Sequence, residues 1–328
     1  SACDGQATVR IYNEVFAPPL NEATNVKAAD VLRAHDASGI DVSIVIPAHN
    51  AMSRLTSALD SLLAQTYPRE RMEVLVTDGG STDATWETLC TYQERYPALF
   101  KVERLEVVAS GSPAKPRNVA LEKAQGKYVF FLDADDWLGS EAIERMLDHA
   151  VEWGSDVLLV KMWGENGREV PKSMFDRNQP KADIATSKIC WTFAPLKLFR
   201  RDLVADMRFP NDMPEDIPFV LEAYLRAKCI SVAADYAYYH VSFDSADEQA
   251  SVTSWDNPHS TIRIYQRVLD LQEEFGRSDH DFAVVWKRLF NRDVLRTQSV
   301  IEQTGIVLDK GEQLTMQRLK DAFDSVDG

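Results

Sequence analysis

The sequence predicts an α/β fold in which helices cover both faces of a doubly wound, mostly parallel sheet, followed by a helical C-terminal region. Two observations predict it. From Asp41 onward, short apolar runs that suit buried strands alternate with longer runs whose apolar residues recur at helical spacing. From Pro258 onward, only the helical spacing continues. We therefore expect an N-terminal extension (1–40), an α/β domain (41–258) and a helical region (259–328).

The alternation can be followed element by element. A first strand is expected at Val42–Ile46, ended by Pro47, and Ser112 is expected to cap a helix that has Pro113 in its first turn. The other expected strands are 72–78, 100–108, 128–132 and 155–163, and the expected helices are 27–35, 51–65, 81–96, 112–125 and 140–154. The last region has apolar helix faces at Ile262, Tyr265, Leu269, Phe282, Trp286, Leu289 and Phe290.

Composition excludes several classes of protein. The chain has 328 residues and a formal net charge of −15, without any run rich in Lys or Arg, so nucleic acid and anionic membrane surfaces are poor partners. Its four cysteines are far apart in the sequence and show no metal-binding spacing, which favours a reducing compartment. We find no signal-peptide pattern and no apolar run long enough to cross a bilayer. These features predict a cytoplasmic protein.

A cluster of acids follows the most apolar expected strand, in "KYVFFLDADDWL". Asp133, Asp135 and Asp136 lie within four positions, and Asp78 follows another strand at the same expected edge of the sheet. A single Asp there would be an ordinary turn residue, but three together repel one another and need a counter-ion. Because all their ligand atoms are oxygens, the cluster predicts Mg²⁺ or Mn²⁺, together with a phosphate-bearing substrate.

An ordered set of motifs resembles a known family. "SIVIPAHN", "VTDGGSTD", "GSPAKPRNVAL", "YVFFLDADDWL" and "LKLFRRDLV…FPNDMPEDIPFVLEAY" resemble, in order and spacing, the inverting nucleotide-sugar glycosyltransferases of the bacterial family 2 type, which have the GT-A fold. The resemblance covers about residues 41–245. It implies a metal-dependent enzyme that moves a sugar from a nucleotide-diphosphate donor, most simply UDP-linked, to a hydroxyl of a glycan or cell-surface polymer.

The resemblance also implies a role for individual residues. Asp135 would bind the metal, with Asp133 facing the ribose or sharing the metal, and Asp136 and His240 assisting. Asp216, in the "ED" motif, would be the general base that takes the proton of the attacking hydroxyl. Donor contacts would come from the remaining members of the motifs: Pro47, Ala48, His49, Asn50, Asp78, Arg117 and Ala134, next to Asp133 and Asp135.

The acceptor side is less specific in sequence. Trp163, Trp191 and Phe193 could stack on acceptor sugars, although aromatic residues at such positions are more often part of the core. Relatives that decorate wall teichoic acid make a polyol-phosphate polymer a reasonable acceptor and would place the enzyme at the inner face of the membrane. An acidic protein would need a local basic groove to hold such a polyanion, and the sequence does not reveal one. The "DSADEQASVTSW" stretch would cover the donor but has no cation for the diphosphate.

Two other functions remain open. One is a GT-A module that binds sugar or polymer without turnover, against which the complete acid cluster and Asp216 argue. The other is a sugar-nucleotide nucleotidyltransferase, which would need a Gly-rich, Arg-containing loop where "PAHNAMSRL" stands. The helical region should pack on the catalytic domain or on another subunit, as in a homo-oligomer.

Overall fold

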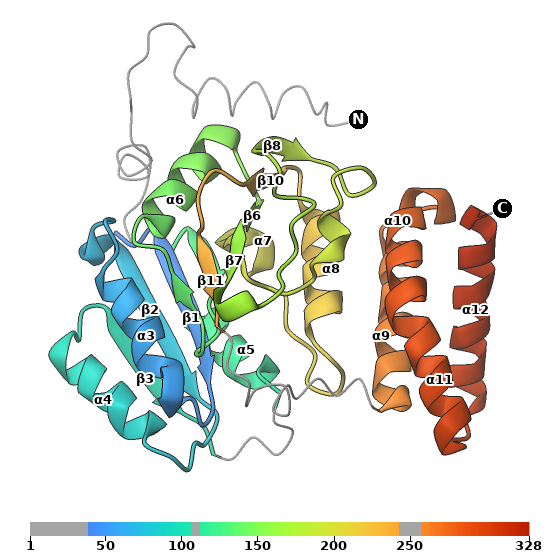
Figure 1. Cartoon of the computed structure of the whole chain (residues 1–328), viewed down its shortest axis with the longest axis horizontal. Coiled ribbons are helices and arrows are strands. Elements are labelled where there is room, and N and C mark those ends of the chain that lie inside the picture. The colour runs from blue at the N-terminus through green and yellow to red at the C-terminus, as the bar shows by residue number, and fades with distance from the viewer. Residues whose placement is uncertain (1–38, 107–111, 243–256, 328) are drawn as a thin grey trace, which may run out of the picture.

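The protein is described by a computed structural model that covers residues 39–106, 112–242 and 257–327. Its main sheet has eight strands in the order β3-β2-β1-β4-β9-β6-β10-β8, and a three-stranded sheet, β5-β11-β7, lies beside it (Figure 1). The strands are β1 Val42–Ala48, β2 Met72–Asp78, β3 Phe100–Arg104, β4 Tyr128–Phe131, β5 Trp137–Leu138, β6 Val157–Val160, β7 Met162–Gly164, β8 Gln179–Ala182, β9 Lys197–Arg200, β10 Ile230–Ala233 and β11 Tyr239–Val241.

The helices alternate with the strands and then form the C-terminal region, as predicted. They are α3 Met52–Leu63, α4 Thr85–Arg95, α5 Ala114–Lys123, α6 Ala142–Trp153, α7 Arg201–Val204, α8 Asp216–Arg226, α9 Pro258–Glu274, α10 Asp279–Leu289, α11 Leu295–Thr304 and α12 Lys310–Asp327. The helix expected at 27–35 lies outside the described residues. Among the described helices, none combines the length and apolar character needed to span a bilayer.

The order of the strands brings the predicted site residues to one edge. β1 pairs in parallel with β2 and β4, whereas β9 is antiparallel to both β4 and β6. The carboxyl ends of β1, β2, β4 and β6 therefore meet at one edge of the sheet, where α/β proteins bind ligands. Asp78 ends β2 at that edge and Asp133 follows β4 there.

Two sequence predictions about element boundaries were wrong. β1 continues through Pro47 to Ala48, because its register with β2 pairs Pro47 with Thr77. The backbone of Val45 faces β4, because its carbonyl accepts a hydrogen bond from the Leu132 N–H. The backbone of Pro47, two residues later, faces the same side. Since β4 ends at Phe131, the missing N–H of Pro47 leaves no strand hydrogen bond unmade. Helix α5 begins at Ala114 rather than at Pro113, although Ser112 Oγ still accepts the Ala114 N–H at 3.1 Å.

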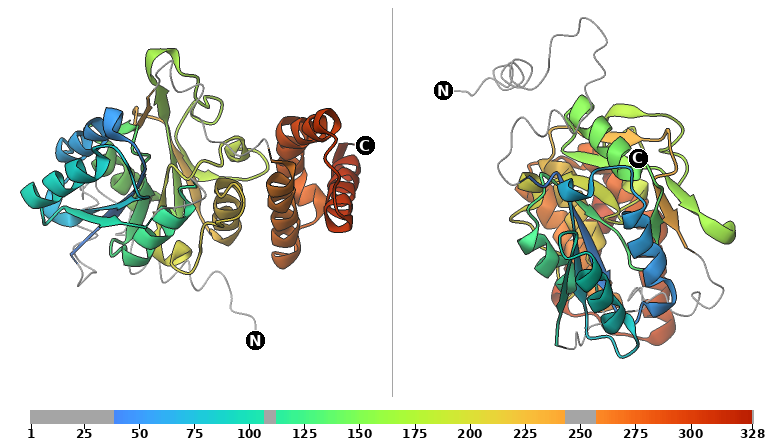
Figure 2. Two further views of the ribbon diagram at one scale, coloured as in Figure 1. Left: turned by 90° about the horizontal axis from the view of Figure 1, so that it is seen from below. Right: turned by 90° about the vertical axis from the view of Figure 1, so that its left-hand side faces the viewer.

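The two faces of the sheet support two cores. Ile44 and Ile46 on β1 pack with α3, α4 and α6, and the intervening Val45 packs with α5 and α8, as strand alternation requires. The second core continues without a break into the apolar faces of α9 and α10, through residues such as Tyr265 and Trp286. Figures 1 and 2 show α9–α12 as a bundle lying against the α8 side of the sheet domain. The helical region packs on the α/β domain, which is the first of the two predicted alternatives.

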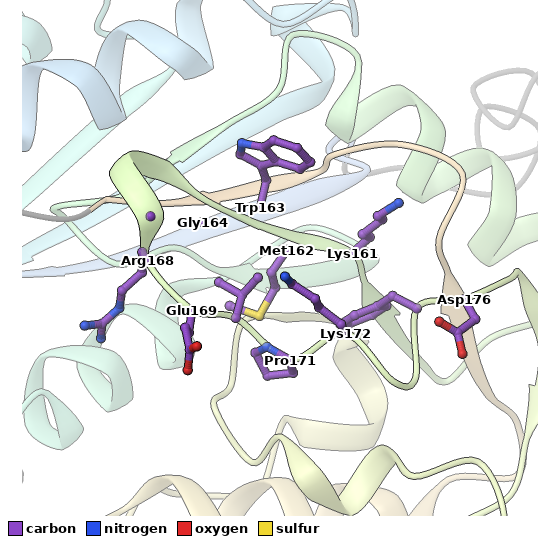
Figure 3. Close-up of a pocket in the computed structure, with 12 residues that line it drawn as sticks. Lys161, Met162, Trp163, Gly164, Arg168, Glu169, Pro171, Lys172 and Asp176 are labelled. Carbon is purple, nitrogen blue, oxygen red and sulfur yellow. The ribbon is translucent and has the colours of Figure 1, made fainter.

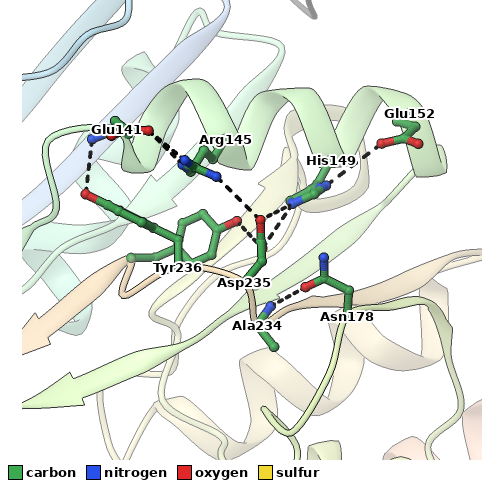
Figure 4. A network of polar contacts seen from close by, with 9 residues as sticks. Glu141, Arg145, His149, Glu152, Asn178, Ala234, Asp235 and Tyr236 are labelled. Carbon is green, nitrogen blue, oxygen red and sulfur yellow. Dashed lines mark hydrogen bonds and ion pairs between the residues drawn. The ribbon is translucent and has the colours of Figure 1, made fainter. Parts of the chain in front are cut away.

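A polar network holds α6 against the segment that leads into β11 (Figure 4). Asp235 accepts hydrogen bonds from Tyr238 Oη at 2.8 Å and contacts His149 Nε2 at 3.1 Å, while Arg145 lies 3.6 Å away. Burial opposes ionisation here, yet the hydrogen bonds from Tyr238 and His149 lower the pKa of Asp235. His149 also stacks on Trp153. The network fixes the chain just before β11, which reaches the site.

Candidate active site

Four side chains from three distant segments form the centre of the site, and we call them the Arg117 cluster. Arg117 lies on α5, with 4% of its side chain exposed. Its Nη2 donates to Asp133 at 3.0 Å, and its Nη1 donates to Glu215 and to Asp216, each at 3.0 Å. One guanidinium therefore joins the turn at residues 133–136 after β4, which we call the acid turn, to the start of α8. The resemblance assigned Arg117 to the nucleotide, whereas these contacts also join it to the predicted base.

The cluster leaves Arg117 charged at every ordinary pH. Burial alone would favour its neutral form, but Asp216, Asp133 and Glu215 raise the pKa of Arg117. Its Nε atom is buried without a hydrogen-bond partner, and its guanidinium lies 5.4 Å from the centre of the Phe209 ring. Three carboxylates share this cation, so the cluster has excess negative charge.

Asp216 is the first residue of α8, at the positive end of the helix dipole. Burial, followed by the charges of Glu215 and Asp133, raises the pKa of Asp216 to about 7, while Arg117 and Lys197 act in the opposite direction. The side chain keeps 41% of its surface open to solvent, so water offsets part of this rise. A carboxylate with a raised pKa that is reachable from solvent suits a general base near neutral pH.

Lys197 lies behind this base, and the sequence reasoning gave it no role. It begins β9 opposite Leu159 of β6 and is only 2% exposed. Its Nζ donates to the Ala194 carbonyl and lies 6.0 Å from the centre of the Tyr224 ring. Burial lowers the pKa of Lys197 to about 7, although the charge of Asp216 favours the ammonium form. A lysine inside an apolar strand is the sequence signal that could have revealed it.

The acid turn divides into an inward and an outward part. Asp136 is buried; its carboxylate accepts Tyr239 Oη and the Ser242 N–H, each at 2.7 Å. Burial, then Asp133 and Asp135, raise the pKa of Asp136 to about 8. Asp136 thus ties the turn to β11. The Asp135 side chain, by contrast, is 56% exposed, with Arg54 at 3.6 Å.

The donor atoms for a metal ion are limited in this turn. Ala134 is buried between Asp133 and Asp135. His240 lies on β11, where its ring stacks on Trp137 and its Nδ1 is 2.8 Å from Glu165. Within residues 39–106, 112–242 and 257–327, no group of three or more His, Cys, Asp or Glu side chains could hold a metal ion. A metal here would need ligands from the substrate or from water, which is how Mg²⁺ is commonly bound.

Asp78 and the end of β1 form the wall that the resemblance predicts to contact the nucleotide donor. Asp78 is fully buried, accepts hydrogen bonds from the hydroxyl and N–H of Ser81, and pairs with Arg104 Nε at 3.3 Å. Arg104, which also packs over the Trp86 ring, was missed because it pairs with Asp78 only through the β2–β3 register. Beside this wall lies a small pocket of about 80 Å³, lined by Pro47, Ala48, His49, Gly79, Ser112, Pro113 and Pro116.

Asn50 completes this corner in a left-handed conformation, with φ 47°. Its side-chain oxygen accepts the Thr82 N–H at 2.8 Å, and its N–H donates to Ser81 Oγ at 2.9 Å. The loop after β1 is thereby joined to the loop after β2. The residues of both loops that are predicted to contact the nucleotide-sugar donor therefore lie together.

Comparison with known proteins identifies the family of the chain. Residues 43–207 match the family described as "Glycosyl transferase family 2". The chain belongs to glycosyltransferase family 2. The family resemblance and the GT-A fold predicted from the motifs are confirmed.

Several of the similar proteins are named for action on one polymer, poly(ribitol-phosphate). A poly(ribitol-phosphate) beta-glucosyltransferase from Bacillus spizizenii is 43% identical over 204 residues, covering 61% of this chain and 32% of that protein. Poly(ribitol-phosphate) beta-N-acetylglucosaminyltransferase TarP from Staphylococcus aureus is 32% identical over 237 residues, covering 69% of this chain and 72% of TarP. A crystal structure of S. aureus TarS with UDP-GlcNAc aligns at a TM-score of 0.71 and 32% identity, over 85% and 79% of the two chains.

Some of these relatives are much longer than the chain. It spans 32% of the B. spizizenii protein and 44% of full-length TarS.

A larger pocket lies at the same edge of this family 2 domain, on the far side of β11, and we call it the β7 pocket (Figure 3). Its volume is about 520 Å³. Met162, Val170, Pro171 and Phe175 form its apolar wall, and its charged residues are Lys161, Arg168, Glu169, Lys172 and Asp176.

The three aromatic residues predicted for the acceptor side have different environments. Trp163 is 53% exposed and Trp191 is 44% exposed, so both are accessible. Phe193 is buried in the core, 5.6 Å from the Arg288 guanidinium, and is not available for stacking on a sugar. The loop predicted to cover the donor, residues 244–255, lies outside the described residues.

Proposed function

We propose that this chain transfers a hexosyl or N-acetylhexosaminyl group from a UDP-sugar to a hydroxyl of a ribitol-phosphate polymer, with inversion at the anomeric carbon. The Arg117 cluster carries the proposal, because it places a carboxylate of raised pKa beside the acid turn that the family uses for the donor. The named relatives and the UDP-GlcNAc complex of TarS support the donor and the acceptor.

The residues of the cluster divide the chemistry between them. Asp216 would accept the proton of the acceptor hydroxyl while the hydroxyl oxygen bonds to the anomeric carbon and the bond to the UDP oxygen breaks. Arg117 would hold Asp216 in place and oppose its protonation. A single displacement converts an α-linked donor into a β-linked product, in keeping with "beta" in the relatives' names.

We also propose that Mn²⁺ or Mg²⁺ binds at the acid turn. Asp135 is the best placed ligand because it faces solvent, and Asp133 would lie next in the shell. Asp136 and His240 would mainly hold the acid turn and β11 in place rather than bind the metal. The Asp136 carboxylate already accepts two hydrogen bonds, and His240 Nδ1 faces Glu165. A bound dication would supply positive charge to the leaving diphosphate.

Replacement of Asp216 tests the catalytic proposal. Asp216→Asn keeps the size of the side chain but cannot take a proton, so kcat should fall about 10²–10⁴-fold while UDP-sugar affinity changes little. The assay is transfer of labelled sugar to poly(ribitol phosphate), with UDP binding measured by calorimetry. Asp212→Asn, on the same loop with a side chain 67% exposed, is the matched control. Wild-type kcat in Asp216→Asn would remove Asp216 as the base. Loss of UDP binding alone would make it a donor ligand.

The metal proposal has its own measurement. UDP should bind more tightly with Mn²⁺ than with EDTA, and Asp135→Asn should remove most of that difference because it loses a charged oxygen ligand. Asp324→Asn, at an exposed position of α12, should leave it unchanged. Equal UDP affinity with Mn²⁺ and with EDTA in the wild-type protein would refute the metal assignment.

A further inference from the structure

The β7 pocket has a charge pattern that the rest of the molecule does not lead one to expect. The chain carries a net charge of −15, yet residues 161–188 contain six Lys or Arg and four Asp or Glu, an excess of two positive charges. The pocket gathers three of these cations, Lys161, Arg168 and Lys172. A local excess of positive charge in an acidic protein is a surface that attracts anions.

The pocket is built from a tight turn after β7. Gly164 allows this turn, because a Cβ atom there would lie 1.8 Å from the Arg168 carbonyl oxygen. Asn166 and Gly167 follow in left-handed conformations, with φ 48° and 86°. The chain thereby returns alongside β7 and encloses about 520 Å³. The glycines shape the cavity, and the charged side chains stand around it.

The cations are spread along the pocket. In Figure 3, Lys172 reaches toward Met162, with Arg168 on one side of it and Lys161 on the other. Trp163, which also lines the pocket, points away from Met162 across the β7 strand, as strand alternation requires. Neither Lys161 nor Lys172 forms a side-chain ion pair or hydrogen bond with any residue that the structure describes. Glu169 and Asp176, both exposed, stand among the cations.

This pocket is close to the chemistry. β7 and β5 flank β11 in the small sheet, and β5 follows directly on the acid turn. β7 and β5 are two strand spacings apart, which is a distance of about 10 Å. The Tyr239 hydroxyl and His240 join the strands further, through Asp136 on one side and Glu165 on the other. An acceptor polymer whose hydroxyl reacts at Asp216 would contact this edge of the sheet with the part that continues beyond the reacting hydroxyl.

We propose that the β7 pocket is a subsite for the polyol-phosphate acceptor, away from its reacting hydroxyl. Lys161, Arg168 and Lys172 pair with successive phosphates, and Glu169 and Asp176 accept hydrogen bonds from polyol hydroxyls. The mixture of cations and carboxylates suits a polymer in which phosphates alternate with hydroxyl-bearing carbons. This inference rests on the proposed function, because it takes the acceptor from it.

The test is the double variant Lys161→Gln/Lys172→Gln, compared with Lys181→Gln, an exposed lysine of the same segment that does not line the pocket. Exposed ion pairs are weak, so the KM for poly(ribitol phosphate) should rise about three- to tenfold. In the double variant, the KM for the UDP-sugar and the rate with a single ribitol phosphate as acceptor should stay unchanged. In the Lys181→Gln control, all of these kinetic constants should equal those of the wild-type enzyme. An unchanged polymer KM in the double variant would overturn the subsite, as would an equal loss with the single-repeat acceptor.

Direct binding of the polymer by calorimetry, without any donor, separates this inference from the proposed function. If the wild-type protein fails to glycosylate the polymer, the proposed acceptor reaction is wrong. Polymer binding that weakens in the double variant would still support the subsite. Binding equal in both proteins, or undetectable in the wild-type protein, would refute it.

Discussion

The Arg117 cluster and the β7 pocket lie at the same edge of the sheet but hold their charges in opposite ways. In the cluster, a buried guanidinium contacts three carboxylates at 3.0 Å, and each of them is fixed by the end of a strand or helix. In the pocket, Arg168, Glu169, Lys172 and Asp176 are exposed. A reacting centre needs charges that are already positioned, whereas a subsite for a flexible polymer can use charges that adjust.

The comparison predicts that changes in the cluster have much larger effects than changes in the pocket. Arg117→Met should have the largest effect. It leaves three carboxylates without their common cation, so Asp216 would be protonated at neutral pH, and kcat should fall at least about 10³-fold. The folded protein should lose about 3–5 kcal/mol of stability, because breaking a buried ion pair leaves uncompensated charge.

The pH dependence of that stability loss identifies its cause. The pKa of Asp216, which Arg117 lowers in the wild-type protein, would rise further above its unfolded value in the folded Arg117→Met protein. The folded state would then bind more protons, and stability would fall as the pH rises from the unfolded pKa upward. Thermal unfolding between pH 5 and pH 8 measures this. A loss that does not vary with pH would indicate a packing defect instead, and Arg117→Lys, which keeps the charge, separates the two.

Lys197→Met should have a smaller and more specific effect. The Lys197 ammonium lowers the pKa of Asp216, so its removal should move the acidic limb of the kcat–pH profile to higher pH, by about one unit. Lys197 loses its own proton near pH 7, so the two enzymes should differ most below pH 7 and converge above it.

Stability serves as the control for this variant. Below pH 7 the wild-type protein holds a buried ammonium without a carboxylate partner within ion-pair distance in the part of the chain that the structure describes. Methionine should therefore leave thermal stability equal or higher there. A pH profile with an unmoved acidic limb would show that Lys197 has no influence on the base.

The two regions also differ in how far the sequence could predict them. The acids after β4, Asp78 and Asp216 stand at strand or helix ends, where local patterns place them, and the structure brings them to one edge. The contacts of Arg117 with Glu215 and Asp216 join residues 98 and 99 positions apart, and no local pattern encodes them. Lys197 is on β9, whose antiparallel position between β4 and β6 the simple alternation did not predict.

The β7 pocket was invisible in the sequence for a different reason. Its cations, Lys161, Arg168 and Lys172, are separated by apolar residues and by Glu165 and Glu169, so they form no basic run. Only the turn at Gly164 brings them around one cavity. Glu165 is in addition held in contact with β11, because its Oε1 lies 2.8 Å from His240 Nδ1.

Ionic strength gives the smallest predicted effect and the one that compares both regions in a single protein. Screening lengths fall from about 30 Å at 0.01 M salt to about 8 Å at 0.15 M, and exposed charges are screened more than buried ones. The KM of the wild-type enzyme for poly(ribitol phosphate) should therefore rise several-fold over this range. The acidic limb of kcat should hardly move, because Arg117 and Lys197 act on Asp216 from buried positions. In Lys161→Gln/Lys172→Gln the salt dependence of the polymer KM should be smaller than in the wild-type enzyme. Equal salt dependence in both enzymes would mean that the polymer is held by charges outside the β7 pocket.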